Sequence, residues 1–125
     1  MSPRFESFRK ALLRFREALD QVKNPLDRDG AIQRFEFCFE LSWKCIRDAA
    51  EADGLSADSP KACFRVAFQQ GWVDDEMGWL RVLEDRNLSS HTYNEDLAVE
   101  IFDRLPSHLK LMEALARSLA KAEKE

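Results

Sequence analysis

The sequence predicts an all-α fold, an antiparallel up-down four-helix bundle with a short extra helix. Only four glycines and four prolines interrupt 125 residues, so the chain has few turns and its elements must be long. Apolar residues recur at spacings of three and four along most of the chain, as on one face of a helix. A chain of this length can bury roughly two-thirds of its unfolded surface, which makes a core possible without disulfides or metals.

The first helix is expected over residues 3–22. Ser2 before Pro3 is a typical N-cap and first position, and Asn24-Pro25 is expected to stop the helix. Basic residues on its other faces are expected to be solvated. Its apolar seam consists of Phe5, Phe8, Leu12, Phe15, Leu19 and Val22.

The second helix is expected from about residue 29 to residue 53. Residues 35–41 alternate like a strand, but the helical stripe continues far beyond strand length, so a helix is favoured. Gly54 is expected to end it, with Leu55 closing a Schellman motif. A central helix or a subunit interface would explain its surplus apolar residues, which are Phe37, Cys38, Leu41 and Cys45.

Two shorter helices follow. Ser59-Pro60 begins the third helix and Gly71 ends it. Residues 74–76 supply acidic groups to the first turn of the fourth helix. The side chains expected to be buried are Cys63, Phe64, Ala67 and Phe68 in the third helix, and Met77, Leu80, Leu83 and Trp79 in the fourth.

The last helix is expected to restart at a capping box formed by Thr92 and Glu95. Its apolar stripe runs from Leu97 to Leu119, and Pro106 is expected to kink or divide it. We expect one bundle domain over residues 1–120 and a frayed tail over residues 121–125.

The charge balance limits the classes of function. A net charge of −4 argues against broad, salt-driven nucleic-acid binding, which needs a basic surplus. No apolar run approaches the roughly 20 residues of a membrane span, and no signal peptide is evident. The three cysteines lack metal or redox spacing and are expected to be reduced core residues. These observations predict a cytoplasmic protein.

Residues 86–93 (RNLSSHTY) form the candidate site. Arg86 and His91 are five residues apart, which places them about 140° apart on a straight helix. They can act together only if the helix is distorted or if a two-fold dimer brings a second copy opposite. The polar residues between them are poor helix formers and permit a distortion.

The chemistry of this pair suits RNA. An arginine fork binds phosphate, and a histidine exchanges a proton near neutral pH. Together they could hold a scissile phosphate and take a proton from a ribose 2′-hydroxyl without a metal. The plainer alternative is that Arg86 pairs with Asp85 or Glu84 while His91 and Tyr93 cap and pack the junction.

Other polar candidates are more simply structural. Glu36 and Glu40 lie one turn apart and could form a metal pair, but Glu40 also suits an ion pair with Lys44. His108 is expected to be a packed or rim histidine. The tryptophans are expected to anchor the core or an interface. No metal site and no cofactor are predicted.

The motif resembles the R-x4-H-x-Y signature of the HEPN superfamily, and most closely its HepT-like branch, the nucleotidyltransferase substrate-binding proteins. The acidic residues at 95 and 96 fit the same pattern. The segments 33–36 (QRFE), 39–41 (FEL) and 43–44 (WK) are similar to the second helix of the family, and residues 59–75 to its middle. The resemblance spans nearly the whole chain.

The resemblance implies a two-fold dimer that associates with a minimal nucleotidyltransferase. In toxin–antitoxin pairs of this kind the HEPN protein is a metal-independent ribonuclease, and the transferase neutralises it by placing AMP on the tyrosine. Here Arg86 would bind phosphate, His91 would be the general base or acid, Asn87 would support the site, and Tyr93 would accept AMP. The alternative is a non-catalytic subunit that binds nucleotide or substrate for the transferase.

Overall fold

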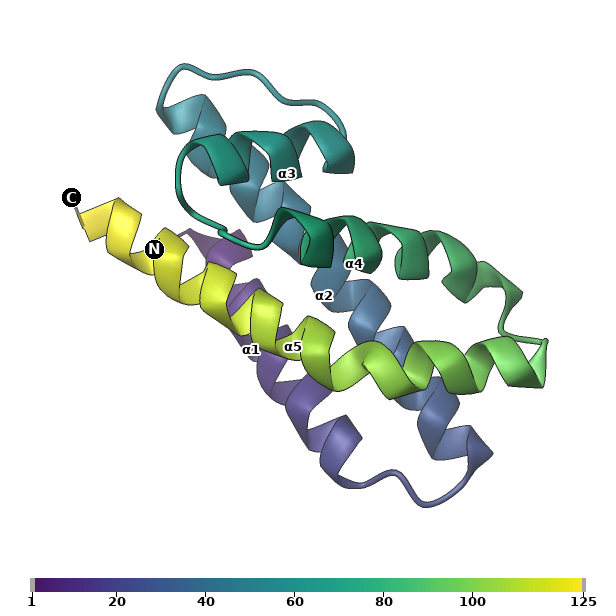
Figure 1. Cartoon of the computed structure of the whole chain (residues 1–125). Helices are drawn as coiled ribbons and strands as arrows, with labels where there is room; N and C mark the ends of the chain where they lie inside the picture. Colours follow the sequence, from purple (N-terminus) through teal and green to yellow (C-terminus); the bar gives the residue numbers. More distant parts are fainter. Residues whose placement is uncertain (1, 125) are drawn as a thin grey trace.

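The computed structural model describes residues 2–124, with only the backbone at position 124, and every regular element in that range is helical. The elements are α1 (Pro3–Asp20), α2 (Pro25–Ala52), α3 (Pro60–Gln69), α4 (Glu76–Leu88), the 3₁₀ turn η1 (Ser89–His91) and α5 (Glu95–Lys124). They form the predicted up-down bundle, in which α3 is the short extra helix (Figure 1).

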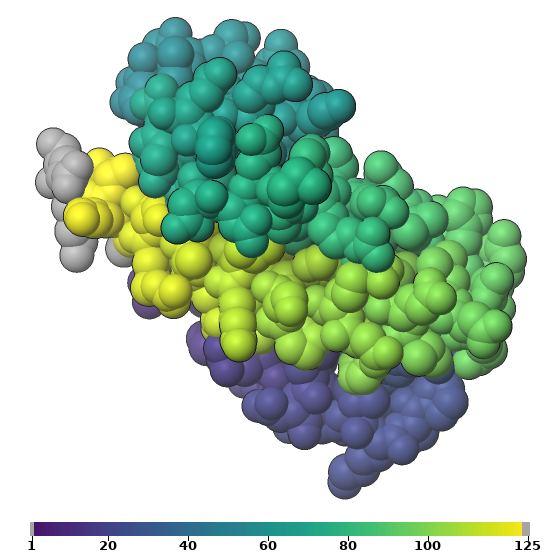
Figure 2. All heavy atoms as spheres, viewed as in Figure 1, coloured from purple at the N-terminus to yellow at the C-terminus, as the bar shows by residue number. Residues whose placement is uncertain are grey.

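The three long helices α1, α2 and α5 pack on one another, while α3 and α4 cover the remaining side of the bundle. The space-filling view shows α5 as a band with α1 and the start of α2 on one side and α3 and α4 on the other (Figure 2). The centre is aromatic, because Phe8, Phe15 and Phe35 are fully buried. Burial of this apolar surface is the main stabilising contribution.

Most helix ends follow the predicted local chemistry. The hydroxyls of Ser2 and Ser59 accept backbone N–H groups at the starts of α1 and α3. Gly54 has a φ of 75°, and the N–H of Leu55 donates to the carbonyl of Ala50 over 2.8 Å, which is the Schellman end expected for α2.

The predicted start of the second helix is wrong. Asn24-Pro25 does not merely stop the first helix, which already ends at Asp20. The Asn24 side chain accepts the N–H of Asp27 over 2.8 Å, and Pro25 is the first residue of α2. The pair is therefore a cap and first position of the kind seen at Ser2-Pro3, and α2 begins four residues earlier than expected.

Three predicted core positions are exposed instead. Phe68 is 43% exposed, Met77 76% and Leu80 38%. The buried face of α4 consists of Trp79, Val82 and Asp85. The Trp79 ring packs on Phe64 of α3 with centroids 4.8 Å apart, which turns the opposite side of α4 toward solvent.

The start of α5 also differs from the prediction. Asn94, not Thr92, caps the helix, since its side chain accepts the N–H of Leu97 over 3.2 Å. The Thr92 hydroxyl donates backwards to the carbonyl of Ser89. Pro106 does not divide α5, which is continuous to Lys124. Residues 121–124 are helical; their fraying stays a prediction, and position 125 lies outside the described residues.

The cysteines are buried and free, as predicted. Burial raises the thiol pKa to about 12 for Cys38, about 12 for Cys45 and about 11 for Cys63. These thiols are therefore neutral apolar groups at physiological pH. Within residues 2–124, no helix is both long enough and apolar enough to cross a membrane.

Candidate functional site

The candidate motif lies where α4 gives way to α5, at the end of the bundle opposite the chain termini (Figure 1). Arg86 is in the last turn of α4, His91 ends η1, and Tyr93 lies in the loop before α5. The helix is thus interrupted within the motif, as the polar composition predicted. The interruption removes the constraint that a straight helix would place on the two side chains.

Arg86 reaches across to α2. Its Nη1 lies 3.3 Å from Glu36 Oε2, and its Nε lies 3.9 Å from Glu40 Oε1. The alternative pairing with Asp85 or Glu84 is wrong, because Glu84 pairs with Arg81 and Asp85 is turned into the core. The guanidinium is held from a helix that is distant in sequence.

Ser89 completes this polar group. Its Oγ lies 2.7 Å from Glu36 Oε2 and 2.7 Å from the carbonyl oxygen of Arg86, two acceptors for one hydroxyl. Arg86 Nη1 also donates to Ser89 Oγ over 3.4 Å. The side chain of Arg86 remains 31% exposed. Its Nε is buried without a hydrogen-bond partner among the described residues, and it lies 3.9 Å from Glu40 Oε1.

His91 and Tyr93 form a separate exposed pair. His91 Nδ1 lies 3.3 Å from the phenolic oxygen of Tyr93, and the two rings are nearly perpendicular at 86°. Tyr93 is 83% exposed, so it does not pack the helix junction. Asn87 is also exposed, and its carbonyl accepts the hydroxyl of Ser90. The motif presents an imidazole, a phenol and an amide to solvent.

The carboxylates of Glu36 and Glu40 on α2 contact Arg86, and Glu40 also contacts its neighbours on the same helix. Glu40 lies 3.9 Å from Lys44 Nζ, as predicted, and accepts the indole N–H of Trp43 over 3.1 Å. Within residues 2–124, no group of three or more His, Cys, Asp or Glu side chains is arranged to hold a metal ion. Glu36 and Glu40 are therefore best described as the ion-pair partners of Arg86.

A buried charged cluster lies directly behind the motif, and the sequence analysis missed it. Asp85 is fully buried, and its two carboxylate oxygens accept hydrogen bonds from Arg104 Nε and Nη2, each over 2.8 Å. His108 Nε2 lies 2.7 Å from the same carboxylate. Burial raises the pKa of Asp85, but hydrogen bonds from His108 and Arg104 outweigh it and lower the pKa to about 2.

The cluster connects the two helices that flank the motif, because Asp85 is on α4 while Arg104 and His108 are on α5. His108 is 3% exposed and stacks on Phe35, which confirms it as a packed histidine. A signal was present in the sequence, because Asp85 continues the three-residue spacing of Trp79 and Val82 on the buried face of α4.

The comparison with protein families decides the class of the molecule. Residues 3–121 match the model of the family described as nucleotidyltransferase substrate binding protein like. The chain belongs to this family. The resemblance to the HepT-like branch drawn from the motif is thereby confirmed.

Comparisons with individual proteins agree with this placement. A Haemophilus influenzae protein named "Probable ribonuclease HepT" is 34% identical over 85 residues, which cover 64% of this chain and 58% of that relative's length. A crystal structure from Thermus thermophilus is 40% identical, with a TM-score of 0.84 over 90% of this chain and 98% of its own.

A second solved structure comes from Haemophilus influenzae and was described as the fold of a substrate binding domain of a nucleotidyltransferase. It is 28% identical, with a TM-score of 0.69 over 94% of each chain. The helical architecture of this chain is thus the fold of its family.

Proposed function

We propose that this chain is the ribonuclease half of a toxin–antitoxin pair and that its partner is a minimal nucleotidyltransferase. It acts in the cytoplasm as a two-fold dimer and cleaves RNA without a metal. The observation that carries the proposal is the exposed His91–Tyr93 pair at the interruption between α4 and α5, five to seven residues beyond Arg86. The family supports the partner, and the name of the Haemophilus influenzae relative supports the reaction.

In the proposed reaction Arg86 binds the scissile phosphate and His91 accepts the proton of the neighbouring ribose 2′-hydroxyl. The 2′-oxygen then bonds to phosphorus, and the bond from phosphorus to the 5′-oxygen breaks. The 5′-oxygen takes up a proton, which leaves a cyclic phosphate and a 5′-hydroxyl. If Nδ1–H of His91 donates to the Tyr93 oxygen, 3.3 Å away, the Nε2 lone pair is free to act as the base.

A dimer would supply the rest of the site. One chain offers a single exposed imidazole in the motif, whereas the reaction needs both a base and an acid. A two-fold axis beside the junction would place a second copy of Arg86 and His91 across the RNA strand. Asn87, exposed on the same segment, would support the bound phosphate.

Tyr93 is the proposed control point. Its phenol is 83% exposed, as an acceptor of AMP must be. Attack of the phenolic oxygen on the α-phosphate of ATP would release pyrophosphate and leave AMP on Tyr93. Because that oxygen contacts the imidazole of His91, the attached phosphate would put bulk and negative charge where the RNA phosphate has to bind.

The deciding experiment is RNA cleavage by the purified protein in the presence of a metal chelator. We expect Arg86→Ala and His91→Ala each to lower the cleavage rate by at least about 100-fold. Arg81→Ala, which removes an exposed arginine of the same helix, is the matched control and should leave the rate unchanged. Undiminished cleavage in both site variants would refute the assignment.

One observation favours the alternative of a non-catalytic binding subunit. Arg86 faces two carboxylates, Glu36 and Glu40, and a guanidinium paired in this way attracts a phosphate less strongly. In that case the chain would present a nucleotide or substrate, or Tyr93 itself, to the transferase.

Incubation with the transferase and ATP separates the two functions. The alternative predicts intact RNA with the wild-type chain and, in its modification form, a mass gain of one adenylyl group that maps to Tyr93. The ribonuclease proposal predicts the same gain together with loss of the cleavage activity. Tyr93→Phe should abolish the mass gain in both cases.

A further inference from the structure

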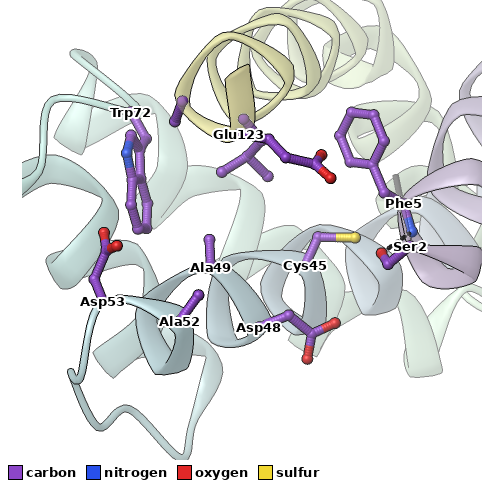
Figure 3. A pocket seen from close by; sticks show the side chains of 11 residues that line it. Ser2, Phe5, Cys45, Asp48, Ala49, Ala52, Asp53, Trp72 and Glu123 are labelled. Atoms are coloured by element: carbon purple, nitrogen blue, oxygen red, sulfur yellow. Dashed lines mark hydrogen bonds between the residues drawn. The ribbon is translucent and has the colours of Figure 1, made fainter. Parts of the chain in front are cut away.

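A cavity of about 420 Å³ lies between the ends of three helices, far from the Arg86–His91 junction. The start of α1, the last turns of α2, the end of α5 and the segment after α3 all contribute to its lining (Figures 1 and 3). Its size is within the range of small-molecule sites. The proposed ribonuclease chemistry does not use it.

Its walls are aromatic and aliphatic. The rings of Phe5 and Trp72, both at least nine-tenths buried, line opposite ends of the cavity in the view of Figure 3. Leu119, Ala49 and Ala52 also line the cavity. Such walls favour a ligand with an apolar body.

The charged groups of the lining are all acidic. Asp48, Asp53 and Glu123 line the cavity, and no lysine, arginine or histidine is among its described lining residues. The carbonyls at positions 50 and 51, at the end of α2, are already hydrogen-bonded to the N–H groups of residues 53–55, so the negative charge at the cavity comes from the side-chain carboxylates. The electrostatic field at this cavity therefore favours a cation over an anion.

Asp53 is the carboxylate best placed to bind a ligand. Asp48 already accepts two hydrogen bonds from Arg4, over 2.8 and 3.0 Å. The Asp53 side chain forms no hydrogen bond or ion pair with the described part of the chain, and it lies at the same end of the cavity as the Trp72 indole (Figure 3). An ammonium group between a carboxylate and an indole face is stabilised by both.

Cys45 adds a neutral wall to the cavity. It is 5% exposed, and burial, followed by the nearby charge of Asp48, raises its pKa to about 12. The protonated thiol brings no charge that would oppose a cation, and it is a poor nucleophile. The cavity therefore suits reversible binding.

We propose that this cavity binds a small organic amine, with its ammonium group between Asp53 and Trp72 and its apolar body along Leu119 toward Phe5. The acidic lining excludes nucleotides and other phosphates, so this site is distinct in its ligand from the Arg86 site at the other end of the bundle. The proposal of an amine site does not depend on the proposed ribonuclease function, and the two are tested by different experiments.

Three probes of the same shape and different charge test this proposal. They are phenethylamine (cationic), phenethyl alcohol (neutral) and phenylacetate (anionic), each titrated into the full chain by calorimetry. We expect the amine to bind roughly tenfold more tightly than the alcohol, and phenylacetate to give no saturable heat. The indole N–H signal of Trp72 should shift on binding of the amine.

Variants locate the effect. Asp53→Asn should weaken the amine roughly tenfold, to the affinity of the alcohol, without changing the affinity of the alcohol itself. Asp20→Asn removes an equal charge at the exposed end of α1, outside the lining, and should change neither. The proposal is overturned if phenylacetate or the alcohol binds as tightly as the amine, if none of the three binds, or if Asp53→Asn leaves the amine affinity within about twofold.

Discussion

Asp85 and Arg86 are neighbours in the chain, but their side chains lie in opposite environments. Asp85 joins Arg104 and His108 in a cluster in which the carboxylate and imidazole are buried. Arg86 leads into an exposed segment that ends at the His91–Tyr93 pair. Each region contains one arginine and one histidine, so the residue types alone do not distinguish them.

The difference lies in how completely the groups are paired. Both oxygens of Asp85 are bonded at 2.7–2.8 Å, and the pairs connect α4 to α5. In the exposed segment the His91 ring contacts a tyrosine that is itself in solvent. A fully paired buried cluster holds helices in place, whereas partly paired groups at the surface remain free to meet a substrate.

The largest expected effect is that of Asp85→Asn. The change leaves Arg104 without its ionic partner and His108 with an altered acceptor in the core, so we expect a loss of about 3 kcal/mol in the free energy of unfolding. Chemical denaturation measures it. Asp103→Asn, at an exposed position of α5, is the matched control and should stay within about 0.5 kcal/mol. A similarly small loss at Asp85 would mean that the cluster is not structural.

The second effect concerns acid stability. The pKa of Asp85 is about 2 in the folded chain, below its ordinary value of 3.8. The stabilisation is therefore complete above pH 3.8 and is lost as the pH falls through about 2, with a size of about 2 kcal/mol. Unfolding measured from about pH 5 to about pH 2 should show this component in the wild-type chain and not in Asp85→Asn. Parallel pH profiles for the two proteins would contradict it.

The third prediction probes the boundary between the two regions. Ser89→Ala removes the hydroxyl that lies 2.7 Å from both Glu36 and the Arg86 carbonyl. We expect a loss of about 1 kcal/mol in the free energy of unfolding. Ser90→Ala, one residue further and exposed, should change it by less than about 0.5 kcal/mol. If Ser89→Ala lowered the free energy of unfolding as little as Ser90→Ala does, the hydrogen bonds of Ser89 would contribute no measurable stability.

The smallest expected effect is that of His91→Ala on stability. Because the imidazole is exposed, the free energy of unfolding should change by less than about 0.5 kcal/mol. The melting temperature, measured beside Asp85→Asn, checks this. A destabilisation comparable to that of Asp85→Asn would remove the contrast between the two regions.

Local signals predicted the fold well. Ser2-Pro3 and Ser59-Pro60 each begin a helix through a serine hydroxyl that accepts a nearby backbone N–H, and Gly54 ends one through backbone hydrogen bonds. The errors arise where tertiary contacts choose among local options. Met77 and Leu80 have helical spacing, but Trp79 has the larger apolar surface and takes the core position against α3.

The site was predictable in location and not in its contacts. The polar run after Arg86 indicated a weak helix, and η1 interrupts the helix there. The partners of Arg86 on α2 and the pairing of Asp85 with Arg104 depend on how distant helices pack. The spacing of Trp79, Val82 and Asp85 indicates that Asp85 turns inward, but it does not identify Arg104 and His108 as its partners.

The exposure of Tyr93 gives this protein a built-in reporter. It is the single tyrosine in the sequence, and its hydroxyl contacts His91. Phenol absorbance and tyrosine-selective labelling therefore report on one position of the molecule without any introduced probe. Both signals can follow the junction directly while RNA, nucleotide or a partner protein is added.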